Sequence, residues 1–210
     1  MKLTVFGATG GVGQEIVRQA LTAGHQVTAV VRDPARFTVT GKGLEVFPAD
    51  VRDPEALRAA VAGRDAVLSG LGARTRADTG VVTELTRSVV RAMDAEGVRR
   101  LVVVSAGPVG PQPADSPLFD RALRVVIGMI FKGVYADLTV MEADLAGSAT
   151  DWTSVRPPRL LDKPLTGTYR KVVGGFPRAG RTIARADVAH AMLGVINDPA
   201  TVKQGVGIAD

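Results

Sequence analysis

A Gly-x-x-Gly-x-x-Gly spacing extends from Gly7 to Gly13, between an apolar stretch and an amphipathic one. Gly7 permits a tight exit from a strand, Gly10 lets the main chain approach a pyrophosphate, and Gly13 lets helix and strand pack closely. The following helix would present unpaired N–H groups and a partial positive charge to the phosphates, and Thr9 adds a hydroxyl donor. The spacing therefore predicts a dinucleotide-binding loop, although a glycine-rich loop alone is also typical of an ordinary turn.

Two arginines follow the next strand-like run. Arg32 comes directly after Val30-Val31, and Arg36 lies one helical turn later. An acidic residue at this point suits the ribose 2′-hydroxyl of NAD, whereas an arginine suits the 2′-phosphate of NADP. Because a guanidinium holds phosphate with two donors, the pair predicts NADP(H), with unspecific surface arginines as the alternative. Asp33 either reaches the ribose or starts the turn at Pro34.

Two further segments follow later strand-like runs. Asp50-Val51 suits an adenine ring, since the carboxylate can accept from the amino group while the valine packs on the ring; the alternative is a turn that enters a helix. In Leu71-Gly72-Ala73-Arg74, Gly72 would let the chain pass close to the cofactor's ribose. Ligands of open parallel sheets bind outside the carboxyl ends of the strands, where we expect both segments.

Ser105 ends the fifth strand-like run at the same edge, next to the expected nicotinamide position. Its hydroxyl would position a substrate carbonyl or relay a proton; alternatively, it caps a turn. The chain has two tyrosines, Tyr135 and Tyr169, and neither is followed four residues later by a lysine. The Tyr-x-x-x-Lys pair, in which the lysine lowers the pKa of the tyrosine for alcohol oxidation, is therefore missing.

A reaction that needs only hydride delivery and a solvent proton remains open. Reduction of a flavin, a quinone or a conjugated tetrapyrrole methine meets this requirement, because the nicotinamide carries the difficult step. The protein would stack a flat acceptor against the nicotinamide. We expect the loop Gly107–Pro117 and the turn Pro157-Pro158-Arg159 to wall that pocket. Arg159 either binds a carboxylate or phosphate of the acceptor or is an exposed turn residue.

The composition excludes several other classes of chemistry. The 210 residues include no Cys and two His, which excludes disulfides and thiol mechanisms and predicts no metal site. The net charge of +5 is spread along the chain, which favours surface charge over a nucleic-acid-binding face. Neither a signal peptide nor an apolar run of about 18–20 residues is apparent, so we expect a cytoplasmic protein without membrane contact.

Strand-like runs alternate with helix-like runs, which predicts an α/β fold: a Rossmann-like, doubly wound parallel sheet with helices on both faces. The expected strands are Lys2–Phe6, Gln26–Val31, Leu44–Phe47, Ala66–Ser69, Arg100–Val104 and Trp152–Val155, the last closing the main sheet. The expected helices are Val12–Ala23, Pro54–Val61, Gly80–Glu96, Leu118–Phe131 and Tyr135–Leu145. Asp53 is the expected cap of the second helix.

We expect residues 1–210 to form a single domain in which residues 157–210 are a substrate-side extension. After Pro157-Pro158 the pattern changes to short extended pieces, a helix at Ala186–Ile196 and a last strand near Gly205–Ile208. This tail is too small to fold independently. It is expected to fold over the open edge of the sheet and to form part of the substrate pocket.

Taken together, these motifs resemble the atypical short-chain dehydrogenase/reductase-like NAD(P)H-binding family, in particular its flavin and biliverdin-IXβ reductases. Pro164-Leu165-Thr166-Gly167 followed by Tyr169 matches the family pattern, as does Pro157-Pro158. The resemblance implies NADP(H) as the cofactor and Ser105 at the active site. The expected cofactor contacts are Gly7, Thr9, Gly10, Gly11, Val12, Arg32, Arg36, Asp50, Val51, Leu71, Gly72 and Arg74, and the expected acceptor contacts are Pro158 and Arg159.

Two departures from the biliverdin reductases bear on the substrate. Arg159 stands where they have a histidine, and no histidine occurs near Leu138, where a second one is expected. The leading prediction is therefore an NADPH-dependent oxidoreductase acting on a flavin or a similar planar acceptor. The alternative is a non-catalytic redox sensor of the NmrA type, with the apolar segment Leu123–Phe131 facing a protein partner rather than the core. An epimerase acting on a nucleotide sugar would need the missing Tyr/Lys pair.

Overall fold

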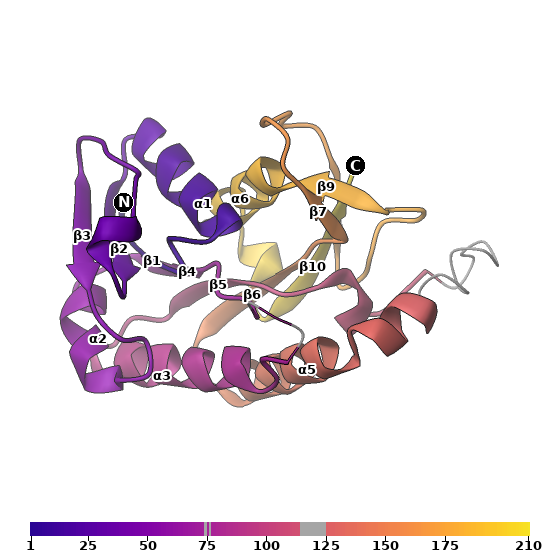
Figure 1. Cartoon of the computed structure of the whole chain (residues 1–210), viewed down its shortest axis with the longest axis horizontal. Coiled ribbons are helices and arrows are strands. Elements are labelled where there is room, and N and C mark those ends of the chain that lie inside the picture. The colour runs from indigo at the N-terminus through magenta and orange to yellow at the C-terminus, as the bar shows by residue number, and fades with distance from the viewer. Residues whose placement is uncertain (74, 76, 114–124) are drawn as a thin grey trace.

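The computed structural model describes residues 1–73, 75, 77–113 and 125–210. Within them, eight strands form one sheet in the order β3-β2-β1-β4-β5-β6-β10-β8 (Figure 1). Neighbouring strands are parallel except for β10 and β8. The strands are β1 (Lys2–Phe6), β2 (Gln26–Val31), β3 (Leu44–Pro48), β4 (Ala66–Ser69), β5 (Arg100–Val104), β6 (Asp151–Arg156), β8 (Arg170–Val173) and β10 (Gln204–Ala209). The first six follow the Rossmann order, which confirms the predicted α/β class.

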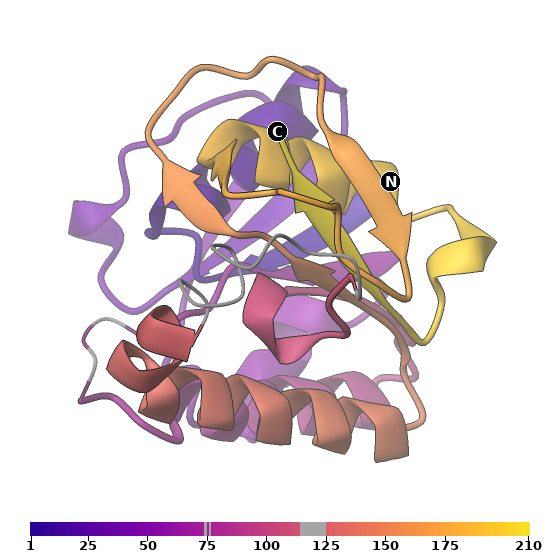
Figure 2. The same ribbon diagram turned by 90° about the vertical axis from the view of Figure 1, so that its right-hand side faces the viewer.

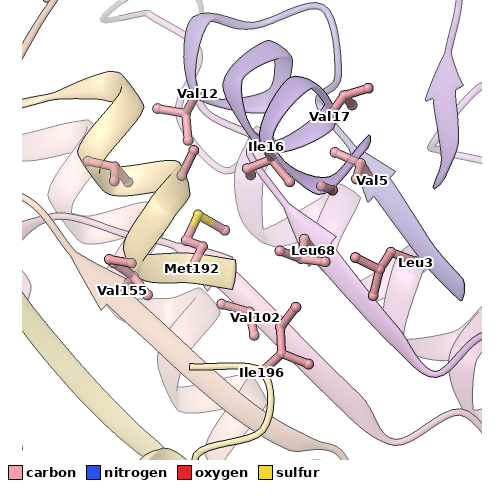
Figure 3. Close-up of a cluster of buried hydrophobic side chains, with 14 of the residues drawn as sticks. Leu3, Val5, Val12, Ile16, Val17, Leu68, Val102, Val155, Met192 and Ile196 are labelled. Carbon is pink, nitrogen blue, oxygen red and sulfur yellow. The ribbon is translucent and has the colours of Figure 1, made fainter. Parts of the chain in front are cut away.

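Helices cover both faces of this sheet. They are α1 (Gly11–Thr22), α2 (Pro54–Val61), α3 (Val81–Ala95), α5 (Lys132–Gly147) and α6 (Arg185–Gly194). Figures 1 and 2 show α1 and α6 on one face and α2, α3 and α5 on the other. Because side chains alternate along a strand, Leu3 and Val5 of β1 pack under α1 while Phe6 packs on the opposite side. Figure 3 shows the α1/α6 side of the core, where Met192 meets the sheet.

Two helices of the second face, α2 and α3, begin in different ways. Asp53 caps α2, as predicted, accepting from the N–H groups of Glu55 at 3.1 Å and Ala56 at 3.3 Å. Gly80 precedes α3 and has no side chain to cap it, so Asp137 of α5 does so instead. Its carboxylate accepts from two backbone N–H groups, Val82 at 2.9 Å and Thr83 at 3.1 Å. A buried carboxylate thus fixes α3 and α5 together.

The prediction that the sixth strand closes the main sheet is wrong. β10 pairs in parallel with β6, and β8 pairs antiparallel on its far side. The tail therefore extends the open edge in the plane of the sheet rather than folding over it, while α6 packs beside α1. Two glycines in β10 make this possible, since a Cβ on Gly205 would meet the Arg156 guanidinium and one on Gly207 would lie 2.3 Å from Gly175 O.

A second, two-stranded parallel sheet pairs β7 (Arg159–Leu161) with β9 (Thr182–Ala184). β7 directly follows the Pro157-Pro158 turn, and β9 runs directly into α6. The predicted helix Leu118–Phe131 lies partly outside the described residues; residues 125–130 are helical, and α5 begins at Lys132.

Candidate functional site

The glycine loop between β1 and α1 forms the close-packed turn that its spacing predicts. Gly7 has a φ of +69°, which favours glycine, and Gly10 N donates to Gly7 O at 2.9 Å. A Cβ on Gly13 would lie 2.1 Å from Gly7 O, so only glycine lets α1 start this close to β1. α1 then begins at Gly11 without a side-chain cap. Its first N–H groups therefore remain available to phosphate.

One further glycine, which sequence reasoning missed, completes this packing. Gly70 follows β4, and its N–H donates to Phe6 O at 2.9 Å. A Cβ on Gly7 would lie 2.6 Å from Gly70 C, and one on Gly70 would lie 3.1 Å from Gly13 N. The available signal was a pair of glycines, Gly70 and Gly72, directly after a strand-like run.

A cleft of about 670 Å³ opens over this loop at the carboxyl edge of the sheet. The predicted site residues that line it are Gly7, Thr9, Gly10, Gly11, Val12, Arg32, Asp50, Val51, Leu71, Gly72, Ser105 and Pro158. Arg36 does not line the cleft, Arg159 lines a neighbouring cavity, and Arg74 lies outside the described residues. The fold thus brings most of the sequence-predicted residues to one continuous surface.

The two arginines expected at a 2′-phosphate lie near η1 (Pro34–Arg36), a short 3₁₀ helix after β2. Arg32 precedes this helix, and Arg36 is its last residue. Arg32 is exposed and lines the cleft, whereas Arg36 is exposed outside it. Within the described part of the chain, neither guanidinium makes a hydrogen bond or an ion pair, so both are available to an anion. Asp33 Oδ1 accepts from Ala35 N at 3.1 Å. Of its two interpretations, the structure supports the start of a turn.

Asp50 and Val51 lie where an adenine ring is expected, just after β3. Val51 is buried, and Asp50 Oδ1 accepts from Arg52 N at 3.0 Å in the turn that leads toward α2. The second carboxylate oxygen of Asp50 has no partner among the described residues. One carboxylate oxygen of Asp50 therefore forms the turn, and the other remains available to accept a hydrogen bond from a ligand.

Ser105 lies directly after β5 and is anchored by its backbone, because its N–H donates to Val155 O at 2.8 Å. Its side chain is buried, yet within the described residues Oγ has no hydrogen-bond partner. Leaving a buried hydroxyl unpaired costs free energy, so such a group in a cleft calls for a ligand or a water.

A buried ion pair that the sequence did not reveal lies close to Ser105. Arg156, at the end of β6, pairs with Glu142 of α5, and Ser154 Oγ donates to Glu142 Oε1 at 2.7 Å. Burial would raise the pKa of Glu142, but the hydrogen bonds from Arg156 and Ser154 and the nearby Ser105 hydroxyl hold it below the ordinary value. Ser105 contributes without the geometry of a full hydrogen bond. The available signal was a glutamate on the apolar face of a helix.

A second cavity, of about 400 Å³, adjoins the cleft. Both are lined by the same four residues at their junction: Ala106, Tyr135, Pro157 and Pro158. The lining of the second cavity is mainly apolar, with Ile127, Phe131 and Phe176 among its members. Of the expected loop Gly107–Pro117, it includes Gly107, Pro108 and Gln112, whereas residues 114–117 lie outside the described residues.

Arg159 places a positive charge at this second cavity. The side chain is exposed, and the guanidinium makes no hydrogen bond or ion pair with any residue that the structure describes. Tyr135, at the junction of cleft and cavity, has its pKa raised by burial, which keeps the phenol protonated. Four residues on, Thr139 donates its hydroxyl to Tyr135 O at 2.8 Å. This tyrosine can donate a hydrogen bond, and the residue one helical turn after it is a threonine and not a lysine.

Within the described residues, no group of three or more His, Asp or Glu side chains is arranged to hold a metal ion. In the same part of the chain, no helix combines the length and apolarity required to cross a membrane.

Comparison with known proteins places this geometry in a family. Residues 7–199 match the sequence family described as NAD(P)H-binding. A 3-diazoavenalumate denitrifying reductase from a Streptomyces species is 35% identical over 228 residues, covering 96% of this chain and 74% of that protein. A (4-alkanoyl-5-oxo-2,5-dihydrofuran-3-yl)methyl phosphate reductase from Streptomyces griseus is 30% identical over 185 residues, covering 84% of this chain. The chain spans just over half, 57%, of that reductase's own length.

Among solved structures, a putative NADH-flavin reductase from Streptococcus pneumoniae shares the fold, with a TM-score of 0.79 at 22% identity, covering 100% of this chain and 99% of that one. The family match shows that the chain belongs to the NAD(P)H-binding family, which confirms the resemblance read from its motifs. The residues present fit such a cofactor: one cleft is lined by a glycine cradle with free amides, and by an arginine and a buried hydroxyl that have no partner among the described residues.

Proposed function

We propose that this chain is an NADPH-dependent oxidoreductase that delivers hydride to a flavin or a similar planar conjugated acceptor. The observation that carries the proposal is the apolar cavity joined to the cofactor cleft at Tyr135, Pro157 and Pro158. A flat acceptor in that cavity would meet the cofactor at the junction. The proposal is further supported by the family of the chain and by the relatives that are named reductases.

The residues around the junction suit such a transfer. When bound, the reduced nicotinamide supplies a hydride, and a proton from water completes the reduction of the acceptor. Phe131, Phe176 and Pro158 provide apolar surface for a ring system and exclude water from it. Ser105 offers a hydroxyl at the end of the cleft nearest β5, where it would orient a carbonyl of the acceptor or of the nicotinamide. None of these tasks needs the Tyr/Lys pair.

Arg159 narrows the chemical class of the proposed acceptor. Its unpaired guanidinium at an apolar cavity fits an acceptor that joins a flat ring to a carboxylate or phosphate. FMN has such a phosphate and riboflavin does not, so the two flavins test this contact directly. We expect Arg159→Ala to raise the KM for FMN about 10-fold and to leave that for riboflavin nearly unchanged.

The deciding experiment is the rate of NADPH oxidation, followed by absorbance, with FMN, riboflavin, a quinone and a bile pigment as acceptors. Sustained turnover with the flavins is the expected result. No turnover with any of the four acceptors, despite bound NADPH, would overturn the proposal.

One observation favours a second function, a redox sensor that binds NADP(H) and a protein partner. Residues 125–130 form a helical segment whose side chains Val125, Val126, Met129 and Ile130 are 48–67% exposed. An exposed apolar group of this kind is typical of an interaction surface. Ile127 of the same segment lines the acceptor cavity, which instead connects it with the reductase. NADPH binding without turnover on any acceptor is the result that would favour the sensor.

A further inference from the structure

A cation from the far end of the sequence reaches the glycine loop. Arg185 is the first residue of α6, and its side chain crosses the first turn of α1. A Cβ added to Gly11 would lie 2.6 Å from Arg185 Cδ and 3.0 Å from its Nε. Arg185 also lines the cofactor cleft together with Gly7 and Gly10. The guanidinium therefore lies beside the amides that the loop presents to a diphosphate.

The electrostatics of this position favour an anion. The N-terminus of a helix carries a partial positive charge, and α1 has no acidic residue in its first turn to offset it. A guanidinium placed there is repelled unless a negative group lies between the two. In the structure Arg185 pairs with Asp162 at 2.5 Å, but the Asp162 side chain is 88% exposed. The Arg185 side chain is only 31% exposed, and an ion pair with so exposed a partner contributes little, so Asp162 does not account for the placement of Arg185.

We propose that Arg185 binds the diphosphate of the nicotinamide cofactor, and that residue 11 is glycine because the Arg185 side chain occupies the space of a Cβ. The site would then hold the diphosphate from two sides: backbone amides of the loop on one, and a planar two-donor cation from α6 on the other. This proposal rests on cofactor binding and is independent of the acceptor and of the proposed reductase activity.

The test measures the Kd of NADPH and of NADH by fluorescence titration. We expect Arg185→Met to weaken both nucleotides by the same factor, about 10- to 100-fold, because the diphosphate is common to them. Arg18→Met is the matched control: it removes one positive charge from the exposed side of α1 and should change neither affinity by more than about twofold. Unchanged affinity in Arg185→Met, or loss of NADPH affinity alone, would overturn the assignment.

A double-mutant cycle tests the role of Gly11. φ at Gly11 is not positive, so alanine fits the backbone, and its Cβ would displace the Arg185 side chain. Gly11→Ala should therefore weaken both nucleotides about as much as Arg185→Met, and the double variant should be no weaker than Arg185→Met alone. Additive losses would show that Gly11 and Arg185 act separately and would contradict the proposal.

Asp162→Asn separates a ligand contact from a structural ion pair. If Arg185 acts on the diphosphate, removing Asp162 frees the guanidinium, and both nucleotides bind at least as tightly as to the parent chain. If Arg185 instead serves to anchor β7 through Asp162, the Asn variant loses affinity as Arg185→Met does, which would overturn the proposal. Thermal unfolding of each variant verifies that affinities are compared between folded proteins. Failure of every acceptor to turn over would overturn the reductase function and leave these affinities unaffected.

Discussion

Arg32 and Ser105 lie in one cleft, and within the described residues the side chain of each lacks a partner. They differ in how they are exposed. Arg32 is solvated and unpaired, which costs little, whereas Ser105 Oγ is buried and unpaired, which does cost free energy. A substitution at Arg32 therefore tests which nucleotide is bound. A substitution at Ser105 tests an interaction that only a bound molecule completes.

Arg32→Glu should discriminate between the two nicotinamide nucleotides. Replacing a cation by an anion beside the 2′-phosphate should weaken NADPH about 100-fold or more, while NADH changes by less than about threefold. Fluorescence titration with both nucleotides measures this, and Arg87→Glu on the outside of α3 is the control for net charge. Equal weakening of the two nucleotides would mean that Arg32 does not contact the 2′-phosphate.

Ser105→Ala should separate turnover from affinity and from stability. We expect the rate of acceptor reduction to fall about 10-fold or more, with the Kd of NADPH unchanged. Because Oγ makes no full hydrogen bond with any described residue, its removal should lower the free energy of unfolding by less than about 1 kcal/mol. Ser148→Ala, at the end of α5, provides the control. An unchanged rate would make Ser105 a turn residue without a role in the reaction.

At the scale of elements, the start of α3 shows what local sequence does and does not determine. Asp53-Pro54 carries its own cap, and α2 has the predicted bounds. Gly80 carries none, and the cap of α3 comes from Asp137, which is 57 residues away in the sequence (137 − 80). Local patterns located both helices, but the residue that stabilises the second one became evident only from the packing of α5 on α3.

Asp137→Ala should destabilise the protein well beyond the loss of an ordinary surface carboxylate. It leaves the N–H groups of Val82 and Thr83 unpaired in a buried place, at a cost of about 2–3 kcal/mol in the free energy of unfolding. Denaturant unfolding measures the difference. Glu84→Ala, an exposed acidic residue in the same first turn, should cost less than about 0.5 kcal/mol. Equal effects of the two variants would show that Asp137 does not act as the cap.

At the scale of the whole molecule, the Glu142–Arg156 pair joins a helix that covers one face of the sheet to the sheet itself. Glu142 lies on α5, Arg156 ends β6, and the guanidinium packs on Gly205 of β10 and on Gly110. Breaking a buried pair leaves a charge uncompensated, so Glu142→Gln should cost on the order of 3 kcal/mol at neutral pH. Glu55→Gln, in an exposed pair with Arg58, should cost less than about 1 kcal/mol.

The same pair makes the free energy of unfolding depend on pH in the acidic range. Because the pKa of Glu142 is lower in the folded protein than its ordinary value of 4.5, its stabilisation is present above that value. This stabilisation is lost as the pH falls below 4.5 and through the pKa that Glu142 has in the folded protein. The parent chain should therefore lose stability more steeply than Glu142→Gln as the pH is lowered from 6 to 3 in denaturant titrations. Parallel curves would show that the ionisation of Glu142 is not coupled to folding.

The glycine loop and most of the lining of the cleft were accessible from the sequence, because backbone chemistry leaves a pattern in adjacent residues. Gly7, Gly10 and Gly13 and the arginine after β2 are such signals. The remainder was not accessible, since Arg185 reaches the cleft and Glu142 comes close to Ser105 through packing between elements that local patterns do not connect. Likewise, the order of the first six strands follows the common rule of right-handed crossovers between parallel strands. The placement of β10 instead depends on the close contacts that its glycines allow beside β6.

The position of β10 between β6 and β8 has a consequence for biosynthesis. β8 is translated about thirty residues ahead of β10, yet β10 is its neighbour in the sheet, and within the described residues it has no other. While the ribosome adds those residues, the nascent chain exposes three strand edges at once: one of β6 and both of β8. α6 also follows β8 in the chain, so the α1 side of the sheet remains partly uncovered during the same interval, and chaperone dependence and misassembly should be greatest then.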